Sequence, residues 1–362
     1  MIETESPSGE FQAKLEVVRG LLRDRGDAAA ILQTRRNFAW LTAGGDNHVL
    51  ETSEIGVAAV LITPKDAVVL TGINEAARIQ EEELVGIPLE VVALPWERPE
   101  ALSEEIRARV DGHVADDAEL EEDLRPHRMR LTSGEQARLA QLGARTSQAV
   151  TKTLADARTG ELETAVAQRL ATTLAADGIH APVILVASDH RILRFRHPIP
   201  KPKPIDQSLM LVVGSERGGL IVAMTRMVWL RGRPDLETLR RFDAVTRVHK
   251  AFRVATRPGS TLADVLAAGI TAYAAEGYAD EWRLHHQGGP IGYQGREEFA
   301  TPTSDVVVEN GMTFAWNPSI TGTKAEDTFI LHADGRQEIV TRDPDWVSGP
   351  DGEPLIWVRD SE

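Results

Sequence analysis

The sequence predicts an α+β fold, an antiparallel sheet covered by helices on one side, preceded by a smaller α/β domain. Along the second half of the chain, two helical patterns are followed by strand patterns, and this order then recurs. A highly charged segment with a proline, residues 115–135, separates this half from the first and is interpreted as a linker. We therefore expect a first domain over residues 1–125 and a second over residues 126–362.

The first half alternates short helical and strand patterns. Within residues 10–24, the apolar residues Leu15, Val18, Leu21 and Leu22 have the spacing of one helix face. Apolar runs bounded by turn residues predict buried strands, and charges gathered on one face predict a second helix. The predicted strands are 28–32, 56–63, 66–72 and 89–95, and the second predicted helix is 99–110.

The second half contains the repeated pairs of helices and strands. Two apolar runs around a glycine-rich turn predict a hairpin over residues 208–230. We expect Ser133 to cap the first helix of this half, and Ser260 or Thr261 to cap the last. The predicted helices are 134–156, 161–177, 234–256 and 261–276, and the other predicted strands are 181–188, 311–320 and 326–332.

Composition excludes several classes of function. The 362-residue chain has a formal net charge of −15, which argues against nucleic acid and anionic membranes as partners. It has no cysteine, which excludes disulfides and thiolate-bound metals and fits a cytoplasmic protein. The N-terminal segment is polar and acidic, unlike a signal peptide, and no apolar run is long enough to span a bilayer. We expect a cytoplasmic protein whose partner is a small molecule.

Residues 285–298, HHQGGPIGYQGREE, suggest a hydrolytic metal site. The segment places His285 and His286 before a glycine-rich turn, and Arg296 beside a glutamate. Such a site would need further carboxylate or histidine ligands from elsewhere in the chain.

The order of motifs over about residues 130–340 resembles the pita-bread family of methionine aminopeptidases, aminopeptidase P, prolidase and creatinase. The first half is similar to the N-terminal domain of the creatinase and prolidase branch. In the metallopeptidases of this family, two Asp, one His and two Glu hold two divalent metals. The matching positions here are Val212 in LMLVVG, Ala223 in GLIVAMTR, Gly289 in HHQGG, Asn317 in NPS and Glu326 in EDT.

Only Glu326 of these five positions keeps the ligand of the metallopeptidases. Valine, alanine and glycine offer no ligand atom, and asparagine is a weak neutral ligand. Because one carboxylate cannot hold two divalent metals, we expect no metal and no other cofactor. A mononuclear site of His285, His286 and Glu326 stays open as an alternative, although adjacent histidines on a strand point to opposite faces.

Creatinase, the metal-free member of this family, also has an alanine at the position of Ala223, and its version of the histidine motif resembles the present one. The resemblance implies that Arg296 binds a substrate carboxylate and that His197, in RFRHPIPKPKP, is catalytic. Creatinase grips the guanidinium of creatine with two glutamates, and here Thr225 replaces one while Glu326 keeps the other. Because a fork-shaped cation needs paired acceptors, we do not expect creatine as the substrate. The matching motif residues are His285, Gly288, Tyr293, Gly295, Arg296 and Glu297.

Each candidate also has a structural interpretation. His197 could be a surface histidine, and His285 a buried histidine bonded to backbone. His286 is expected to point away into packing. Arg296 could form an exposed ion pair with Glu297, which would contribute little energy.

Further residues complete the candidate site. Glu326 could form a salt bridge with Arg226, and we group Arg226, Thr225 and Asn317 with the substrate-binding residues. Asp189 and His190 are near the same cleft in sequence. In the creatinase branch, a loop of the first domain reaches the active site of the neighbouring subunit. The resemblance therefore implies a homodimer and makes His48 and Thr52, in GGDNHVLETSE, candidates.

The resulting hypothesis is a metal-independent enzyme that cleaves, most simply by hydrolysis, a C–N bond of a small carboxylate-bearing molecule. His197 would act as general acid and base, Arg296 would anchor the carboxylate, and His285 would steady the intermediate. Glu326 would bind or protonate the reacting nitrogen, because apolar walls around it are expected to raise its pKa by desolvation.

Other functions stay open. The fold does not fix the reaction, so a lyase or an isomerase is also consistent with the sequence. A pita-bread pseudoenzyme that acts as a binding module is the alternative from a different class, and a metal-dependent Xaa-Pro peptidase is less favoured than either.

Overall fold

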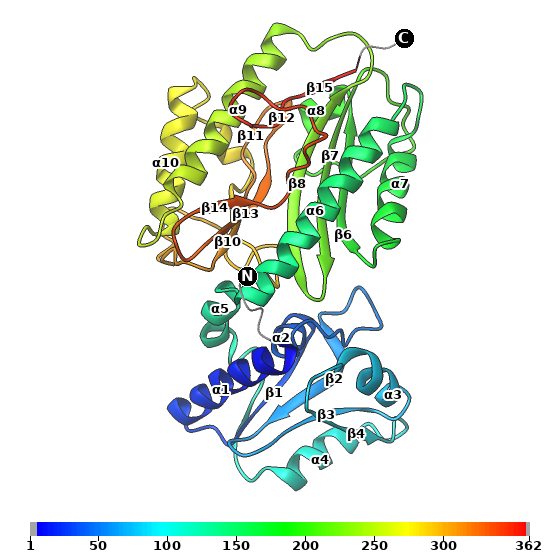
Figure 1. Ribbon diagram of the computed structural model, residues 1–362, viewed down its shortest axis with the longest axis vertical. Helices are drawn as coiled ribbons and strands as arrows, with labels where there is room; N and C mark the ends of the chain where they lie inside the picture. The colour runs from blue at the N-terminus through cyan, green and yellow to red at the C-terminus, as the bar shows by residue number, and fades with distance from the viewer. Residues whose placement is uncertain (1–5, 360–362) are drawn as a thin grey trace. The chain divides into compact units, whose positions relative to one another are not determined.

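The computed structural model describes residues 6–359, which divide into two units. The first holds the described residues up to Glu135 with Gly218–Leu220, and the second holds Gln136–Arg217 with the described residues from Ile221 onward. Helices and largely antiparallel sheets occur in both, which confirms the predicted α+β class (Figure 1). The boundary expected at 125/126 lies inside α5 (Glu121–Met129). No helix among the described residues is both long and apolar enough to cross a membrane.

The first unit is built on a five-stranded sheet with the strand order β4-β3-β2-β1-β5. Its central pairs, β1 with β2 and β2 with β3, are antiparallel, whereas β4 and β5 pair in parallel at the two edges. The strands are β1 (Ala29–Thr34), β2 (Ile55–Ile62), β3 (Ala67–Gly72), β4 (Glu90–Leu94) and β5 (Val114–Ala115). The helices are α1 (Pro7–Arg25), α2 (Arg35–Leu41), α3 (Ala76–Arg78), the short η1 (Ile79–Glu83), α4 (Ala101–Arg109) and α5.

The segment 115–135 is not the linker that its charge suggested. It contains α5, whose first turn is acidic and whose last turn is basic, the distribution that favours the helix dipole. Leu120, Leu124 and Met129 are buried along it. The burial of these three apolar residues explains why so charged a segment is folded.

The second unit holds the candidate site on three sheets. A four-stranded sheet has the order β15-β8-β7-β6, a second has the order β14-β13-β10-β9, and β11 pairs with β12. The strands of the first are β6 (His180–Ser188), β7 (Ser208–Arg217), β8 (Leu220–Trp229) and β15 (Trp357–Val358). Those of the others are β9 (Gly288–Pro290), β10 (Thr313–Trp316), β11 (Ser319–Ile320), β12 (Thr323–Lys324), β13 (Asp327–Leu331) and β14 (Gln337–Ile339).

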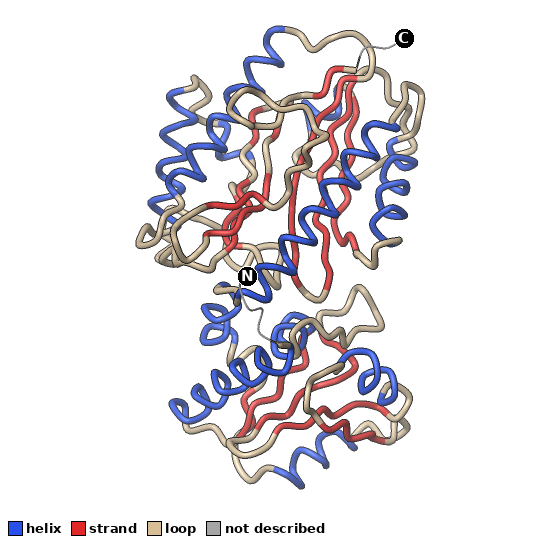
Figure 2. Tube along the Cα trace, in the orientation of Figure 1, coloured by secondary structure: helices blue, strands red, loops and turns tan. Residues whose placement is uncertain are grey.

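Helices pack against these sheets, as the blue tubes beside the red strands of the second unit in Figure 2 illustrate. Helix α7 packs on β6, while α9 packs on α10 and on strands β10 to β12. The helices are α6 (Ser133–Asp156), α7 (Glu163–Ala175), α8 (His190–Arg194), α9 (Leu236–Ala255), α10 (Leu262–Ala275) and the 3₁₀ turn η2 (Glu281–Leu284).

The first two sheets of the second unit meet where β8 passes the start of β13. Thr225 and Glu326 form an isolated bridge, in which the Thr225 amide donates to the Glu326 carbonyl at 3.1 Å. Two residues away, the Thr328 hydroxyl accepts from the Ala223 amide at 2.8 Å and donates to the Ala223 carbonyl at 2.9 Å. These bonds fix the side chain of Glu326 beside the face of β8.

The structure shows which residues cap the N-termini of α6 and α10. Before α6, Thr132 and Glu135 exchange side-chain-to-amide bonds of 2.7 and 3.2 Å, so the cap lies one residue before the expected Ser133. At α10 the cap is Thr261, whose hydroxyl accepts from the Asp264 amide at 3.1 Å while the Asp264 carboxylate accepts from the Thr261 amide at 2.9 Å. This reciprocal pair is a capping box.

The alternative between Ser260 and Thr261 can be tested directly. Thr261→Ala should lower the free energy of unfolding by about 1 kcal/mol, because it leaves a first-turn amide of α10 without its acceptor. Ser260→Ala is the matched control and should cost less, since Ser260 contributes main-chain hydrogen bonds to this turn. Urea unfolding of both variants measures the difference, and equal costs would contradict the assignment.

Candidate active site

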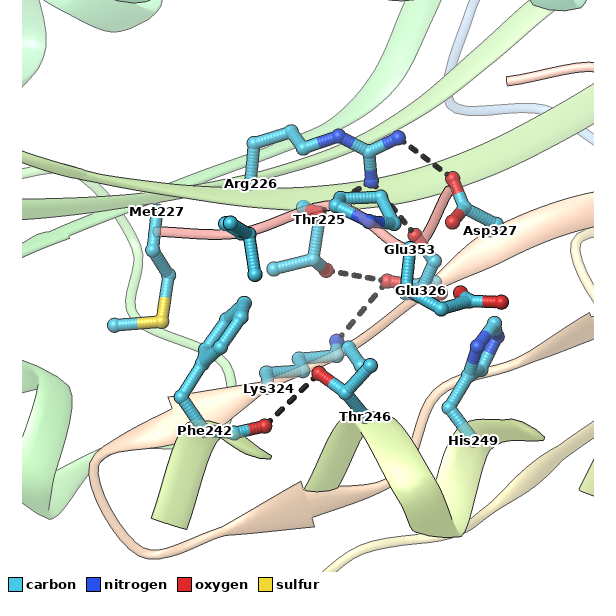
Figure 3. Close-up of a pocket in the computed structure, with 13 residues that line it drawn as sticks. Thr225, Arg226, Met227, Phe242, Thr246, His249, Lys324, Glu326, Asp327 and Glu353 are labelled. Atoms are coloured by element: carbon cyan, nitrogen blue, oxygen red, sulfur yellow. Dashed lines mark hydrogen bonds and ion pairs between the residues drawn. The ribbon is translucent and has the colours of Figure 1, made fainter. Parts of the chain in front are cut away.

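Glu326 is a buried carboxylate held between two cations. Its side chain is 3% exposed, with Nη2 of Arg296 3.1 Å from Oε1 and Nζ of Lys324 3.3 Å from Oε2. The Thr225 hydroxyl donates to Oε2 at 2.7 Å, and Figure 3 shows Glu326 between Thr225 and Lys324. With all three groups ionised, two positive charges share one negative charge. A surplus positive charge is therefore left in a buried place, where an anion would be stabilised.

These neighbours keep Glu326 ionised. Burial alone would raise its pKa, but Lys324 and Arg296 and the hydrogen bond from Thr225 outweigh burial and lower the pKa to about 2. The expectation of a raised pKa is therefore wrong, and with it the role of Glu326 as a proton donor. Apolar residues line the cavity nearby, as expected. Their desolvating effect on the pKa of Glu326 is smaller than the combined effect of Lys324 and Arg296.

Lys324 is the member of this cluster that the sequence did not single out. Burial lowers its pKa, and Glu326 opposes this effect while Arg296 adds to it. Burial likewise lowers the pKa of the Arg296 guanidinium. The only signal in the sequence was spacing, because residues two apart in extended chain project to one side, as Lys324 and Glu326 do.

Arg226 faces away from the Glu326 carboxylate. Its guanidinium donates to Asp327 at 2.8 Å and to the Thr341 carbonyl at 2.9 Å, and it reaches only the main-chain oxygen of Glu326, at 3.3 Å. Figure 3 shows the side chain directed at Asp327. The alternative interpretation of Glu326, a salt bridge to Arg226, is therefore wrong, and Arg226 instead bonds to Asp327 and to the Thr341 carbonyl.

His197 and His285 form a hydrogen-bonded pair with their Nε2 atoms 3.0 Å apart. Nδ1 of His285 lies 2.5 Å from the carbonyl oxygen of His286, which can only accept, so Nδ1 carries the proton of the neutral ring. Burial, followed by the charge of Lys324, lowers the pKa of His285 to about 3, so this ring is neutral near pH 7. Nε2 of His285 is then an acceptor, and His197 donates to it.

This arrangement leaves Nδ1 of neutral His197 without a proton. Burial, with a contribution from Lys324, lowers the pKa of His197, although Glu326 raises it. The ring is therefore in its basic form near pH 7. When His197 takes up a proton, its bond to His285 becomes charge-assisted and stronger. His285 thus orients and supports His197.

His286 lies on the same side as His285. The two ring centroids are 4.2 Å apart and the rings are inclined by 32°. The expectation that adjacent histidines diverge is wrong here, because regular strand geometry begins only at Gly288, the first residue of β9. His286 also lines the cavity described below, instead of pointing into packing, and desolvation with the charges of Arg296 and Lys324 lowers its pKa to about 4.

The three imidazoles could be considered as metal ligands, since His197, His285 and His286 each bring a nitrogen within 4.8 Å of the others. Two observations argue against this interpretation. His197 and His285 already share a hydrogen bond, and Arg296 and Lys324 create a positive field at His286. A field that disfavours a proton disfavours a divalent cation more strongly. Both observations disfavour a metal ion at these three rings.

A cavity of about 350 Å³ joins these groups, at the lower end of the size of small-molecule sites. Its polar end is lined by His197, His286, Arg296, Asn317, Lys324 and Glu326, and most of the remaining lining is apolar. The side-chain oxygen of Asn317 is buried and has no hydrogen-bond partner among the described residues, so a ligand could supply a donor. Thr225 and Arg226 are not among the residues that line this cavity.

Four further candidates have other roles or lie elsewhere. Asp189 accepts main-chain hydrogen bonds from residues 206–208 and pairs with Lys203, so it fixes a turn. His190 starts α8 and is exposed. In the first unit, His48 binds Asp46 and Thr52 is exposed. None of the four lines the described cavity.

The fold and this site define a pita-bread protein with a small-molecule-sized cavity. The model of metallopeptidase family M24 matches residues 137–337. The chain belongs to that family, which confirms the resemblance at the level of the family and of the fold. No curated protein matches the chain significantly in sequence.

Solved structures extend the similarity to nearly the whole chain. A dipeptidase from Pyrococcus horikoshii OT3 is 18% identical with a TM-score of 0.78, covering 96% of this chain and 100% of its own. An Xaa-Pro dipeptidase from Bacillus anthracis is 19% identical with a TM-score of 0.75 and the same coverage. The N-terminal domain of the FACT complex subunit SPT16 from Cicer arietinum is 14% identical with a TM-score of 0.71, covering 92% and 96%. At these identities the likeness establishes the fold alone.

The residues present do not fit the two-metal centre that the family implies. Val212 and Ala223 are apolar, and a side chain at Gly289 would place its Cβ 2.2 Å from the Glu298 carbonyl oxygen. No histidine can therefore occupy Gly289 without moving the backbone. The remaining carboxylate, Glu326, already has Lys324 and Arg296 as counter-ions. The positive charges that metals would bring are supplied by side chains.

Removing the carboxylate should destabilise the protein. Glu326→Gln leaves two buried cations without their shared counter-ion, which should lower the free energy of unfolding by roughly 3 kcal/mol or more. Adding Lys324→Met should recover part of this loss, because it removes one unpaired charge. Urea unfolding measures both variants, and Asp351→Asn, which breaks an exposed ion pair with Lys250, is the control. A stable Glu326→Gln protein would contradict the charge assignment.

Proposed function

We propose that this chain is a metal-independent, homodimeric enzyme that cleaves a C–N bond of a small carboxylate-bearing molecule, most simply by hydrolysis. The observation that carries the proposal is the surplus positive charge of the cluster formed by Arg296, Lys324 and Glu326, at one end of a cavity that His197 also lines. A substrate carboxylate would neutralise that charge. Arg296 can offer two parallel donors to it if it exchanges part of its contact with Glu326.

His197 is the group best placed to move protons. In hydrolysis, Nδ1 of His197 takes a proton from water as the water oxygen bonds to the carbon, and then gives that proton to the leaving nitrogen as the C–N bond breaks. His285 stabilises the protonated ring through the bond between the two Nε2 atoms. Glu326 stays ionised and holds the two cations in place, and the free oxygen of Asn317 can accept an N–H of the substrate.

A binding module without catalysis is the second candidate. It is supported by the similarity of the fold to a domain of a complex subunit, the FACT subunit SPT16 from Cicer arietinum. The hydrogen-bonded pair of His197 and His285 favours the enzyme, because a pure binding site has no need of a base. A metal-dependent Xaa-Pro peptidase is disfavoured by the residues that occupy the ligand positions.

Variants can separate catalysis from binding. Mass spectrometry can measure turnover of N-substituted amino acids and Xaa-Pro dipeptides, with and without a chelator. His197→Asn should abolish turnover but keep carboxylate binding. Arg296→Ala should weaken binding by roughly 2 kcal/mol, about thirtyfold, through loss of a charge-assisted contact. Arg247→Ala, which breaks an exposed ion pair with Glu276, is the control. Turnover that a chelator abolishes and zinc restores would contradict metal independence, and binding without turnover of any compound would favour the binding module.

The pH dependence of kcat/KM should be bell-shaped. Activity should rise with pH through the pKa of His197, which lies below its ordinary 6.5, because only the neutral ring is a base. It should fall through the pKa of Lys324, which lies below its ordinary 10.5, because loss of that charge weakens anion binding. Lys324→Arg should remove the alkaline fall, since arginine stays protonated. An alkaline fall that persists in Lys324→Arg would exclude Lys324 as its source.

A further inference from the structure

Along strands β6, β7 and β8, the lining of the cavity is an apolar sheet face. Residues two apart on a strand share a face, and strand pairing aligns Val183 with Gly214 and Leu185 with Val212 across β6 and β7. On β8, Ile221 and Ala223 have the same spacing and line the same cavity. The six residues of this apolar floor are Val183, Leu185, Val212, Gly214, Ile221 and Ala223.

Gly214 helps to keep the floor open. A Cβ at this position would lie 3.3 Å from Cβ of Val183, so the glycine leaves space between the two strands. Val183, its partner on the edge strand β6, is 43% exposed. Apolar area is thus available to a ligand inside the cavity.

The floor also includes the two positions where the metallopeptidases of the pita-bread family have aspartates. Val212 and Ala223 occupy them, so the wall that would be anionic in those enzymes is here hydrocarbon. A polar or cationic substrate body would lose its hydration against this wall without gaining a hydrogen bond. A hydrocarbon body would gain by leaving water.

We propose that the cavity selects carboxylic acids with a hydrocarbon body, the carboxylate at Arg296 and Lys324 and the body on the apolar floor. This inference rests on the proposed function and names its substrate class. The cavity, about 350 Å³, suits a branched aliphatic or a single-ring aromatic body better than a long chain. The N-substituent to be cleaved would lie within reach of His197, which lines the same cavity.

A homologous series of straight-chain acids tests the selection without knowledge of the natural substrate. Ligand-observed NMR should give dissociation constants that fall about fourfold per methylene from acetate upward, until the cavity is full. The matching alkylamines should bind far more weakly, because the cationic cluster repels them. Val212→Thr should weaken hexanoate about tenfold and acetate far less, since the single methyl group of acetate covers little of the floor. Val254→Thr, at an exposed valine of α9, is the control.

The outcomes separate this inference from the proposed function. Acids that bind with no dependence on chain length would overturn the apolar floor as a selector and leave the anion site intact. If no acid of the series binds, the anion site itself is wrong, and with it the proposed function. Alkylamines that bind as well as the acids would overturn the role of the cationic end in selection.

Discussion

The rest of the site depends on the contact of one buried carboxylate, Glu326, with two buried cations. A carboxylate enclosed in this way must be neutralised, and in this chain Arg296 and Lys324 do so at 3.1 and 3.3 Å. Their charges lower the pKa of Glu326 to about 2 and depress that of His286. They also leave the cavity with a positive charge to share. The cluster therefore sets the charge of the polar lining, whereas desolvation is the main cause of the lowered pKa values of the three histidines.

The charged cluster and the apolar floor both stand where the metallopeptidases of this family have their metal site. With Val212 and Ala223 in place of aspartates, the site has no anionic wall to hold divalent metals, and a side chain at Gly289 would collide with the Glu298 carbonyl. What results is a cavity lined by the cations of the cluster and by the hydrocarbon of strands β6 to β8. In our proposal, such a lining orients an amphipathic acid with its reacting bond near His197, which is hydrogen-bonded to His285.

Much of the fold could be predicted from sequence, because periodicity and turn residues are local signals. The helices α1, α6, α7, α9 and α10 and the strands β6 to β8 begin and end close to the predicted bounds. The exceptions were non-local. The high charge of α5 suggested a linker, because its buried apolar side can be recognised only in the folded protein. Lys324 belongs to no motif that would have marked it as a site residue. The pKa of Glu326 could not be predicted either, since the direction of its shift depends on Lys324 of β12 and on Arg296 of the loop after β9.

Crystallography with anomalous scattering can distinguish an anion site from a metal site in this cavity. Crystals soaked separately in zinc and in a bromine-substituted benzoate would show which ion the cluster accepts. The account predicts carboxylate oxygens within hydrogen-bond distance of Arg296 and Lys324, bromine over the apolar floor, and no zinc peak at Glu326 or at the three histidines. A zinc ion coordinated by Glu326 or by His197, His285 and His286, with no benzoate in the cavity, would contradict it.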